Sequence, residues 1–305
     1  MTAPARSSGT WQNRSIASRR VVVLGLAAGL ATATSAIAAA ARDAVSEELA
    51  ILERQIGGRI GLAVCSAANG ARIDYRTDER FAMCSTFKLM LAAAILARVD
   101  AGQLRLDQRI RYGPDSLLAN SPVTTAHVDE GSLSLQAMAQ AVVEVSDNTA
   151  ANLLLALIGG PAGYTRYLRG LGDRVTRLDR VELALNSNLP HDVRDTTTPR
   201  AVLADMNKVL LGGALSAASR ERVLGWLKDC RTGRERLRAQ LPQGWSAGDK
   251  TGSGDRGANN DLAIFWPPAG APLLLACYLT DSRQPTAVLN AAHARIGAVV
   301  ANALG

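Results

Sequence analysis

Two apolar segments near the end of the chain, Asp261–Trp266 (DLAIFW) and Leu273–Tyr278 (LLLACY), decide the fold class. A connection rich in Gly and Pro separates them, and a third short segment, Trp245–Lys250 (WSAGDK), precedes them. Short segments of this kind, bounded by turn residues, are typical of β-strands. We therefore expect three consecutive strands, followed by a helix over Thr286–Leu304.

A second group of strands is predicted near the other end of the chain. Arg59–Val64 is a short apolar run, Ala68–Gly70 (ANG) supplies turn residues, and Ala71–Tyr75 follows as the second arm of a hairpin. A helix over Val45–Leu52 is expected before this hairpin.

The long middle of the chain is predicted to be helical, because its apolar residues follow a helical pattern and Gly, Pro or capping residues separate the segments. The expected helices are Ser85–Val99, Leu133–Val145, Thr149–Ile158, Tyr164–Leu171, one opened by Thr198 and Pro199 that runs to about Leu211, and Ser219–Asp229.

Strands at both chain ends with helices between them predict an α+β fold. We expect an antiparallel five-stranded sheet flanked by helices, built from both chain ends, with an inserted all-helical subdomain. Residues 41–76 and 229–305 would form the α/β subdomain, and residues 77–228 the all-helical one. The cleft between the two subdomains is the expected place of an active site.

The first forty residues are predicted to be an export signal of the twin-arginine type. Arg19 and Arg20 precede an uncharged stretch that runs to Ala41, and small residues near its end fit a cleavage site. The protein would then be exported to the periplasm, with no stable membrane association after removal of the signal. The alternative is an uncleaved anchor, since about 20 apolar residues can span a bilayer.

The composition is that of an ordinary globular protein, with 305 residues of which 48% are hydrophobic. The net charge is +7, and four of the positive charges lie in the first forty residues, which contain no Asp or Glu. The remaining excess of +3 and the lack of Lys/Arg-rich runs argue against a nucleic-acid partner. Nothing in the sequence indicates more than a monomer.

Neither a metal nor a cofactor is expected, because the residues that commonly bind metals are scattered. The histidines are His127, His191 and His293. The cysteines are Cys65, Cys84, Cys230 and Cys277. We expect the cysteines to be buried thiols. Cys65 and Cys277 lie in predicted strands, and a disulfide between them stays open.

The segment Ser85–Lys88 (STFK) could supply an activated nucleophile. Ser85 begins a predicted helix, so backbone N–H groups and the positive end of the helix dipole surround it. Lys88 lies three residues on, on the same helical face. Apolar surroundings disfavour its ammonium form, and the neutral amine could accept the serine proton.

Three further short segments carry polar groups suited to acyl transfer. Ser146–Asn148 (SDN) offers a hydroxyl that could relay a proton and an amide that could bind a substrate amide. Lys250–Gly252 (KTG) offers an ammonium and a hydroxyl for an anion, with a glycine that allows close approach. Glu182–Asn186 (ELALN) adds a carboxylate and an amide that could handle a water molecule. Taken singly, Ser146–Asn148 is better explained as turn-forming residues at a helix end, and Lys250–Gly252 as the end of an edge strand before a turn.

Together and in this order, these motifs resemble the penicilloyl-serine transferases and, within them, the class A serine β-lactamases. The resemblance runs from about Val45 to the C-terminus and includes Arg80-Phe81, Ser121–Thr124 (SPVT) and Arg194–Pro199 (RDTTTP). It implies a hydrolase that opens the β-lactam amide of penicillins and cephalosporins through an acyl-serine intermediate and confers antibiotic resistance. The sequence does not rank penicillins, cephalosporins and carbapenems as substrates.

The resemblance also implies the catalytic roles. Ser85 would be the acylated nucleophile, with Lys88 as its activating partner. Ser146 would pass a proton to the β-lactam nitrogen. Glu182 would activate the hydrolytic water, which Asn186 would position. Whether Lys88 or Glu182 is the base for acylation is disputed for the family.

Binding roles follow in the same way. Asn148 would hold the amide of the substrate side chain. The substrate carboxylate would be bound by Lys250, Thr251 and Ser253, with Gly252 between them and with Arg236 as an added cation. The backbone N–H groups of Ser85 and Ser253 would form the oxyanion hole. Structural roles would fall to Arg180, Asp195 and Asp147, the first two as an ion pair beside the Glu182 segment.

Some positions depart from the family pattern. The residue after the Lys-Thr-Gly strand that is often arginine is Asn259 here, which is why Arg236 is expected to supply that charge. Asn120 replaces a residue that is often aromatic at the mouth of the cleft. Cys84 precedes the nucleophile as in some carbapenem-hydrolysing relatives, but their partner cysteine would fall at Gly254, so their disulfide cannot form.

Two alternatives share the first three motifs. One is a cell-wall D,D-transpeptidase or carboxypeptidase, which would form the same acyl-enzyme but release it slowly. The other is a receptor domain that only senses β-lactams. Glu182 and Asn186 discriminate against both, because such proteins would lack this pair in this place.

Overall fold

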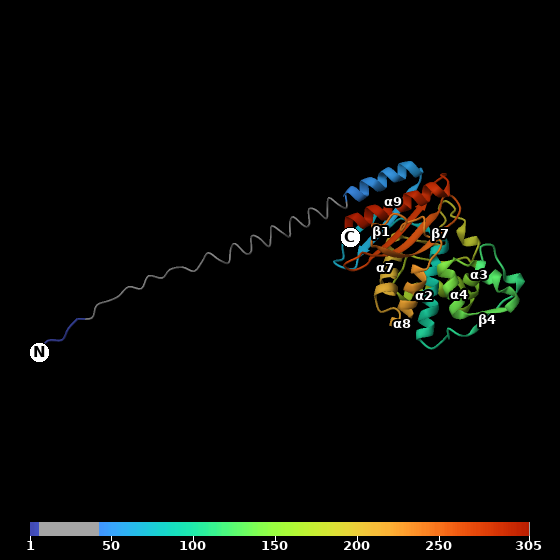
Figure 1. The fold of residues 1–305 in the computed structure, drawn as a ribbon, viewed down its shortest axis with the longest axis horizontal. Helices are drawn as coiled ribbons and strands as arrows, with labels where there is room; N and C mark the ends of the chain where they lie inside the picture. The colour runs from blue at the N-terminus through green and yellow to red at the C-terminus, as the bar shows by residue number, and fades with distance from the viewer. Residues whose placement is uncertain (6–42, 305) are drawn as a thin grey trace. The chain divides into compact units, whose positions relative to one another are not determined.

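The computed structural model describes residues 1–5 and 43–304 (Figure 1). Its contacts divide the chain into Met1–Asp43 and Ala44–Gly305. In the first unit, residues 1–5 are exposed coil. The predicted export signal lies almost wholly outside the described residues. All elements discussed below belong to the second unit.

A five-stranded antiparallel sheet forms the centre of this unit, in the order β2-β1-β9-β8-β7. Its strands are β1 (Arg59–Ser66), β2 (Arg72–Tyr75), β7 (Ser246–Ser253), β8 (Asn259–Trp266) and β9 (Leu273–Thr280). The two chain ends therefore meet at the β1–β9 pair, which confirms the predicted α+β sheet built from both ends. β7 is an edge strand, which leaves its outer side free to line a site.

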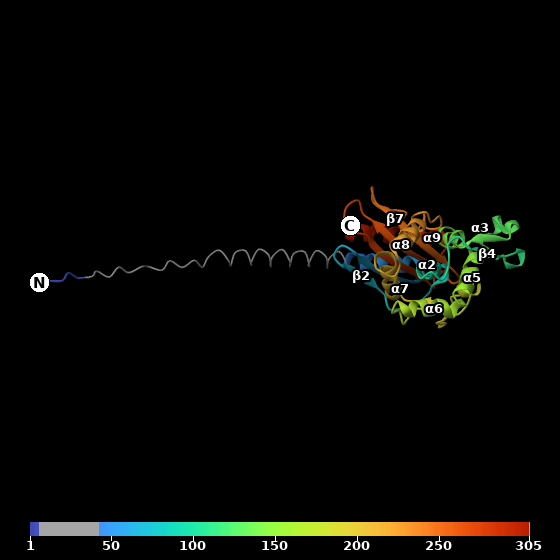
Figure 2. The same cartoon turned by 90° about the horizontal axis from the view of Figure 1, so that it is seen from below.

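Helices cover both faces of the sheet (Figures 1 and 2). One face carries the helix of residues 43–56 and α9 (Thr286–Leu304), whose apolar side chains pack with those of the strands in one core. α9 has the length and composition of a membrane span, but Leu289, Ile296 and Val300 are buried in this core.

The other face carries the remaining helices and a second, larger core. These helices are α2 (Phe87–Asp100), α3 (Pro122–Ala126), α4 (Leu135–Glu144), α5 (Asn148–Leu157), α6 (Gly160–Gly170), α7 (Pro199–Met206) and α8 (Ala217–Lys228). Almost every side chain of α2 is buried, from Phe87 to Leu96, so this helix is the axis around which the others pack. α3 lies at the end far from the sheet in both views (Figures 1 and 2).

Short elements complete the fold. The 3-10 turns are η1 (Cys84–Thr86), η2 (Pro114–Ser116), η3 (Val128–Glu130) and η4 (Ala184–Asn186), and the π-helical turn η5 (Asn207–Leu211) extends α7. Two small two-stranded sheets pair β3 (Phe81–Ala82) with β6 (Thr196–Thr197), and β4 (Arg109–Arg111) with β5 (Ser132–Ser134).

Several predicted helix starts differ from the structure by two to four residues, three of them for a clear physical reason. The Ser85 segment begins as the 3-10 turn η1, and the α-helix starts at Phe87. Leu133 belongs to β5, because Ser134 caps the following helix by accepting a hydrogen bond from the Ala137 nitrogen at 3.1 Å. α6 starts four residues early, because Gly159 adopts φ +89° as its N-cap and a proline occupies its first turn.

The four cysteines are free, which answers the question left open for Cys65 and Cys277. Cys65 faces Leu274 across the β1–β9 pair, and Cys277 faces Leu62. The two thiols are therefore three positions out of register.

Candidate active site

Ser85 lies where the sheet meets the start of α2. It follows Cys84, whose backbone φ is +45°, in the turn η1. Strand β7 runs directly against this turn. A Cβ atom at Gly252 would come within 3.0 Å of the Ser85 nitrogen and 2.9 Å of the Met83 oxygen. Glycine at residue 252 is therefore what allows the strand to approach the nucleophile.

Ser85, Lys88 and Glu182 form a triangle of short polar contacts. Lys88 Nζ donates to Ser85 Oγ at 3.0 Å and lies 2.8 Å from Glu182 Oε1. Ser85 Oγ in turn donates to Glu182 Oε1 at 3.1 Å. The Lys88 and Glu182 side chains are fully buried, so water screens their attraction little. Two groups able to hold a proton therefore face one hydroxyl.

Burial moves both site lysines toward their neutral form. It lowers the pKa of Lys88, a shift that the Glu182 carboxylate opposes. Burial, and then repulsion by Lys88, lowers the pKa of Lys250 to about 7. The two Nζ atoms lie 3.3 and 3.1 Å from Ser146 Oγ. The Ser146 hydroxyl therefore bridges two amines that can exchange protons with it.

Asp147 holds the turn that presents Ser146 and Asn148. Its Oδ1 accepts from the Ala150 nitrogen at 2.9 Å, which caps α5. Its Oδ2 accepts from the nitrogens of Val123 and Thr124 at 3.0 and 2.9 Å, which ties α3 to the same turn. The carboxylate is fully buried, and its hydrogen bonds from Val123, Thr124 and Ala150 tie the turn to the surrounding scaffold.

Asn148 is held from two sides. Its Oδ1 accepts from Lys88 Nζ at 2.5 Å, and its Nδ2 donates to the Ala119 oxygen at 2.7 Å. The amide is thus oriented by a catalytic candidate and by the loop before α3.

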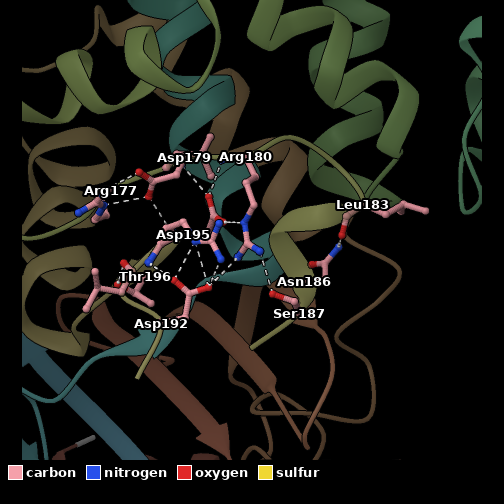
Figure 3. Close-up of polar contacts among 12 residues, drawn as sticks. Arg177, Asp179, Arg180, Leu183, Asn186, Ser187, Asp192, Asp195 and Thr196 are labelled. Atoms are coloured by element: carbon pink, nitrogen blue, oxygen red, sulfur yellow. Dashed lines mark hydrogen bonds and ion pairs between the residues drawn. The ribbon is translucent and has the colours of Figure 1, made fainter. Parts of the chain in front are cut away.

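The segment of residues 177–197, called the Glu182 loop here, is closed by a buried ion pair (Figure 3). Arg180 Nε donates to Asp195 Oδ2 at 2.5 Å. Asp195 Oδ1 accepts from the backbone nitrogens of Asp179 and Arg180 at 2.7 and 2.9 Å. Asp195 is fully buried and Arg180 is one-fifth exposed. One carboxylate therefore joins the two ends of the loop, at the two residues for which the resemblance implied an ion pair.

Glu182 is fixed through both its carboxylate and its backbone. Asn186 Nδ2 donates to Glu182 Oε2 at 2.7 Å. The Asn152 amide on α5 donates to the Glu182 oxygen at 2.9 Å and accepts from the Glu182 nitrogen at 3.0 Å. Sequence reasoning missed Asn152. Its place one helical turn after Asn148 is the signal that could have found it.

A cleft of about 310 Å³ opens over these groups. Predicted site residues in its lining are Ser85, Ser146, Asn148, Asn186, Arg236 and residues 251–253. Lys88, Glu182 and Lys250 are buried. Reactive amines and the carboxylate are thus kept from bulk water while the hydroxyls face the cleft.

Arg236 reaches the cleft from outside the three motifs. Its Nη2 donates to Ser253 Oγ at 2.7 Å, and its Nη1 donates to the Gly252 and Asn260 oxygens at 3.0 and 2.7 Å. Its Nε donates to Asn290 Oδ1 at 3.2 Å, a partner that the sequence analysis did not name. The guanidinium is therefore fixed beside β7, where the predicted carboxylate site lies.

No group of three or more His, Cys, Asp and Glu side chains within residues 1–5 and 43–304 is arranged to hold a metal ion. The buried polar groups of the cleft contact one another instead.

Known proteins share this arrangement of elements and sequence. The profile of the Beta-lactamase enzyme family (Beta-lactamase2) matches residues 44–304. The chain belongs to this family. The solved structure of an ancestral (GNCA) class A β-lactamase matches with a TM-score of 0.84 at 52% identity, covering 85% of this chain and 100% of that one.

Curated relatives place the chain among the class A β-lactamases, hydrolases of the β-lactam amide. Beta-lactamase OXY-2 of Klebsiella oxytoca is 41% identical over 87% of this chain and 91% of the relative. The carbapenem-hydrolyzing beta-lactamase KPC of the same organism is 45% identical over 84% and 88%. The expected family is confirmed, and the transpeptidase and sensor alternatives lose their support.

This β-lactamase has its own features at the cleft mouth. Asn120 lines the cleft with a backbone φ of +57°. Leu183 lines it too, and 43% of the residue is exposed. A Cβ atom at Gly254 would lie 2.6 Å from Cys84 Sγ, so the position facing this thiol is indeed the glycine.

Proposed function

We propose that the chain hydrolyses penicillins and cephalosporins through an acyl-enzyme on Ser85, and thereby confers resistance to these antibiotics. The observation that carries the proposal is the Ser85–Lys88–Glu182 triangle, with Asn186 2.7 Å from the same carboxylate. A transpeptidase or sensor needs only the acylation half of the reaction. A buried carboxylate beside the serine, with an amide partner, supplies the hydrolytic half.

In the acylation step, Ser85 Oγ attacks the β-lactam carbonyl carbon. Its proton passes to the Lys88–Glu182 pair, whose two members lie 3.0 and 3.1 Å from the hydroxyl oxygen. The carbonyl electrons move onto the oxygen, where the backbone N–H groups of Ser85 and Ser253 stabilise the oxyanion.

Collapse of this intermediate breaks the carbon–nitrogen bond. The ring nitrogen takes a proton from Ser146 Oγ as it leaves. Ser146 is then reprotonated by Lys88 or Lys250, which lie 3.3 and 3.1 Å away. Amines whose pKa values are lowered by burial suit this relay, because a proton then moves between groups of similar affinity.

In the deacylation step, Glu182 takes a proton from a water molecule held between its carboxylate and Asn186. The hydroxide attacks the ester carbonyl, and Ser85 Oγ leaves with the returning proton. A carboxylate at this place must stay close to the serine, which is what the Arg180–Asp195 pair and Asn152 secure.

Substrate binding is assigned to the edge of β7 and the start of α5. Lys250, Thr251, Ser253 and Arg236 would bind the substrate carboxylate, since ammonium, guanidinium and hydroxyl groups all donate to it. Gly252 leaves room for the bound substrate. Asn148 would hold the side-chain amide.

We also propose the division into two subdomains and the export signal that the sequence predicts. The α/β subdomain would comprise residues 41–76 and 229–305, and the all-helical subdomain residues 77–228. The active site would lie in the cleft between them.

Residues 1–40 would direct twin-arginine export to the periplasm, where the enzyme would act as a monomer without stable membrane association. Replacing Arg19 and Arg20 by lysine should leave activity in the cytoplasmic fraction; unchanged export would refute the signal type.

Intact-protein mass after brief exposure to benzylpenicillin tests the reaction. The wild type should return unmodified with hydrolysed product in solution, while Glu182→Ala should retain a penicilloyl adduct. Ser85→Ala in the Glu182→Ala background should lose that adduct. A wild type that itself stays acylated for many minutes would contradict the hydrolase assignment.

A further inference from the structure

Thr232, in the turn between α8 and β7, lines the cleft although neither the motifs nor the resemblance assign it a role. Its Oγ1 lies 2.6 Å from Thr251 Oγ1, a short hydroxyl–hydroxyl contact. Its hydroxyl also lies 3.3 Å from the Sγ atom of Cys230. The residue is exposed, whereas Thr251 is 95% buried. Thr232 therefore sits at the open end of a hydroxyl pair whose inner member belongs to the proposed carboxylate site.

The direction of this hydrogen bond determines whether Thr251 presents a hydrogen-bond donor or an acceptor to the cleft. Each hydroxyl has one proton, and only one of the two can donate in their mutual bond. A carboxylate accepts hydrogen bonds and donates none. If Thr251 donated to Thr232, an incoming carboxylate would meet a lone pair of Thr251. If Thr232 donates, the Thr251 proton is free to point into the cleft.

Cys230 favours the second direction. Burial raises the pKa of its thiol to about 11, so the sulfur keeps its proton. The Asp249 carboxylate adds to this upward shift of the Cys230 pKa. Sulfur is a weak hydrogen-bond acceptor, and it does not compete with the Thr251 oxygen for the Thr232 proton. The Thr232 hydroxyl is thus left with Thr251 as its best partner.

The other hydroxyl of the site is oriented in the same manner. Ser253 lies two residues after Thr251 on β7, so the two side chains share a face of the strand. Arg236 Nη2 donates to Ser253 Oγ at 2.7 Å, and a guanidinium cannot accept in return. The Ser253 proton is therefore also free for the cleft. If Thr232 donates to Thr251, both hydroxyls of the site accept a hydrogen bond from a neighbouring side chain and keep their own protons free for the cleft.

We propose that Thr232 is a positioning residue for the substrate carboxylate, which acts by donating to Thr251 and so turning the Thr251 proton toward the bound anion. The proposal rests on the function proposed above. It concerns substrates that carry an anionic group at this subsite, and it leaves the chemistry at Ser85 unchanged.

Steady-state kinetics of Thr232→Val and Thr232→Ser test it. Valine has nearly the shape of threonine without the hydroxyl, and serine keeps the hydroxyl without the methyl group. Thr232→Val should raise KM for benzylpenicillin about five- to tenfold with kcat within about twofold, the size expected for one hydrogen bond between neutral groups. Thr232→Ser should restore KM. The loss should fall to about twofold or less with the methyl ester of benzylpenicillin.

A double-mutant cycle separates positioning from packing. In a Thr251→Val background, Thr232→Val should cause no further loss, because the hydroxyl that it orients is gone. Equal losses in both backgrounds, equal losses on acid and ester, or no loss at all would overturn the proposal while wild-type hydrolysis continued. A wild type that failed to hydrolyse benzylpenicillin would instead refute the proposed function.

Discussion

Two buried clusters of ionisable groups in this molecule differ in how their charges are arranged. In the active site, Lys88 faces Glu182 at 2.8 Å, so opposite charges are paired. Beside the start of the Glu182 loop, Asp205 on α7 faces the carboxyl group of Asp173. Neither carboxylate oxygen of Asp205 meets an N–H or hydroxyl donor among the described residues.

The same physical effect acts on both clusters. Burial lowers the pKa of Lys88. Burial, and then repulsion by Asp173, raises the pKa of Asp205 to about 8, against the opposing effect of Lys208 and Arg169. Asp205 therefore holds a proton at neutral pH and shares it with Asp173. Desolvation thus makes a base in one cluster and a neutral acid in the other, and only the cluster that adjoins the cleft is placed for catalysis.

The largest expected effect comes from removing the opposite charge. Lys88→Met takes away the cationic partner of Glu182, so the buried carboxylate has no opposite charge beside it. The rate of acylation by benzylpenicillin should fall about 10³-fold or more, because the serine loses a group that receives its proton. Stopped-flow kinetics would measure it.

Lys228→Met is the matched control for this change. Lys228 lies over the Trp266 ring at 4.6 Å and does not line the cleft, so its loss should change the rate by less than about twofold. Comparable losses in both variants would mean that the Lys88 effect reflects folding and not chemistry.

The second prediction concerns stability and pH. The folded protein holds the Asp205 proton up to about pH 8, whereas an unfolded aspartate releases it near pH 4. The contribution of Asp205 to the free energy of unfolding is therefore fully present below about pH 4, and it is lost progressively as the pH rises through about 8. Asp205→Asn removes this loss, so its free energy of unfolding should exceed that of the wild type by roughly 5 kcal/mol at pH 8 and by little at pH 4.

Urea unfolding of both proteins at a series of pH values would measure this difference. A gap that stays constant with pH would contradict the shared proton. Hydrolysis of benzylpenicillin by Asp205→Asn should stay close to that of the wild type, because Asp205 does not line the cleft.

The third and smallest effect concerns a carboxylate paired with a cation on the Glu182 loop itself. Asp195→Asn leaves Arg180 without its 2.5 Å partner and should cost about 2 kcal/mol of stability. Deacylation should slow about tenfold or more as Glu182 loses its support. Arg194→Gln removes the more exposed pair with Asp192 and should cost less than about 1 kcal/mol. If deacylation were unchanged in Asp195→Asn, the ion pair would not position Glu182.

Sequence alone predicted those parts of the fold that rest on local patterns. The strands of the main sheet were placed to within a few residues, because short apolar runs and turn residues are local signals. The short pairs β3–β6 and β4–β5 escaped prediction. Phe81 pairs with Thr197 across more than a hundred residues, and a two-residue strand has no periodicity of its own.

The same limit applies to the candidate site: residues in local motifs were predicted, and residues defined by contacts with distant parts of the chain were not. Motif residues were found because their spacing is fixed along the chain. Asn152 and Thr232 were not found, since each gains its role from a partner that is distant in sequence. The Thr232–Thr251 contact spans 19 residues and the Asn152–Glu182 contact spans 30. Only folding brings such groups together.

The close contact between Gly252 and the turn that carries Ser85 has a genetic consequence. Every single-nucleotide missense change in a glycine codon introduces a side chain with a Cβ atom. At residue 252 that atom would meet the backbone of Met83, Ser85 and Thr86 at about 3 Å. Under antibiotic selection we therefore expect substitutions at the mouth of the cleft, at Asn120 or Leu183, to be tolerated. Every substitution of Gly252 should be selected against.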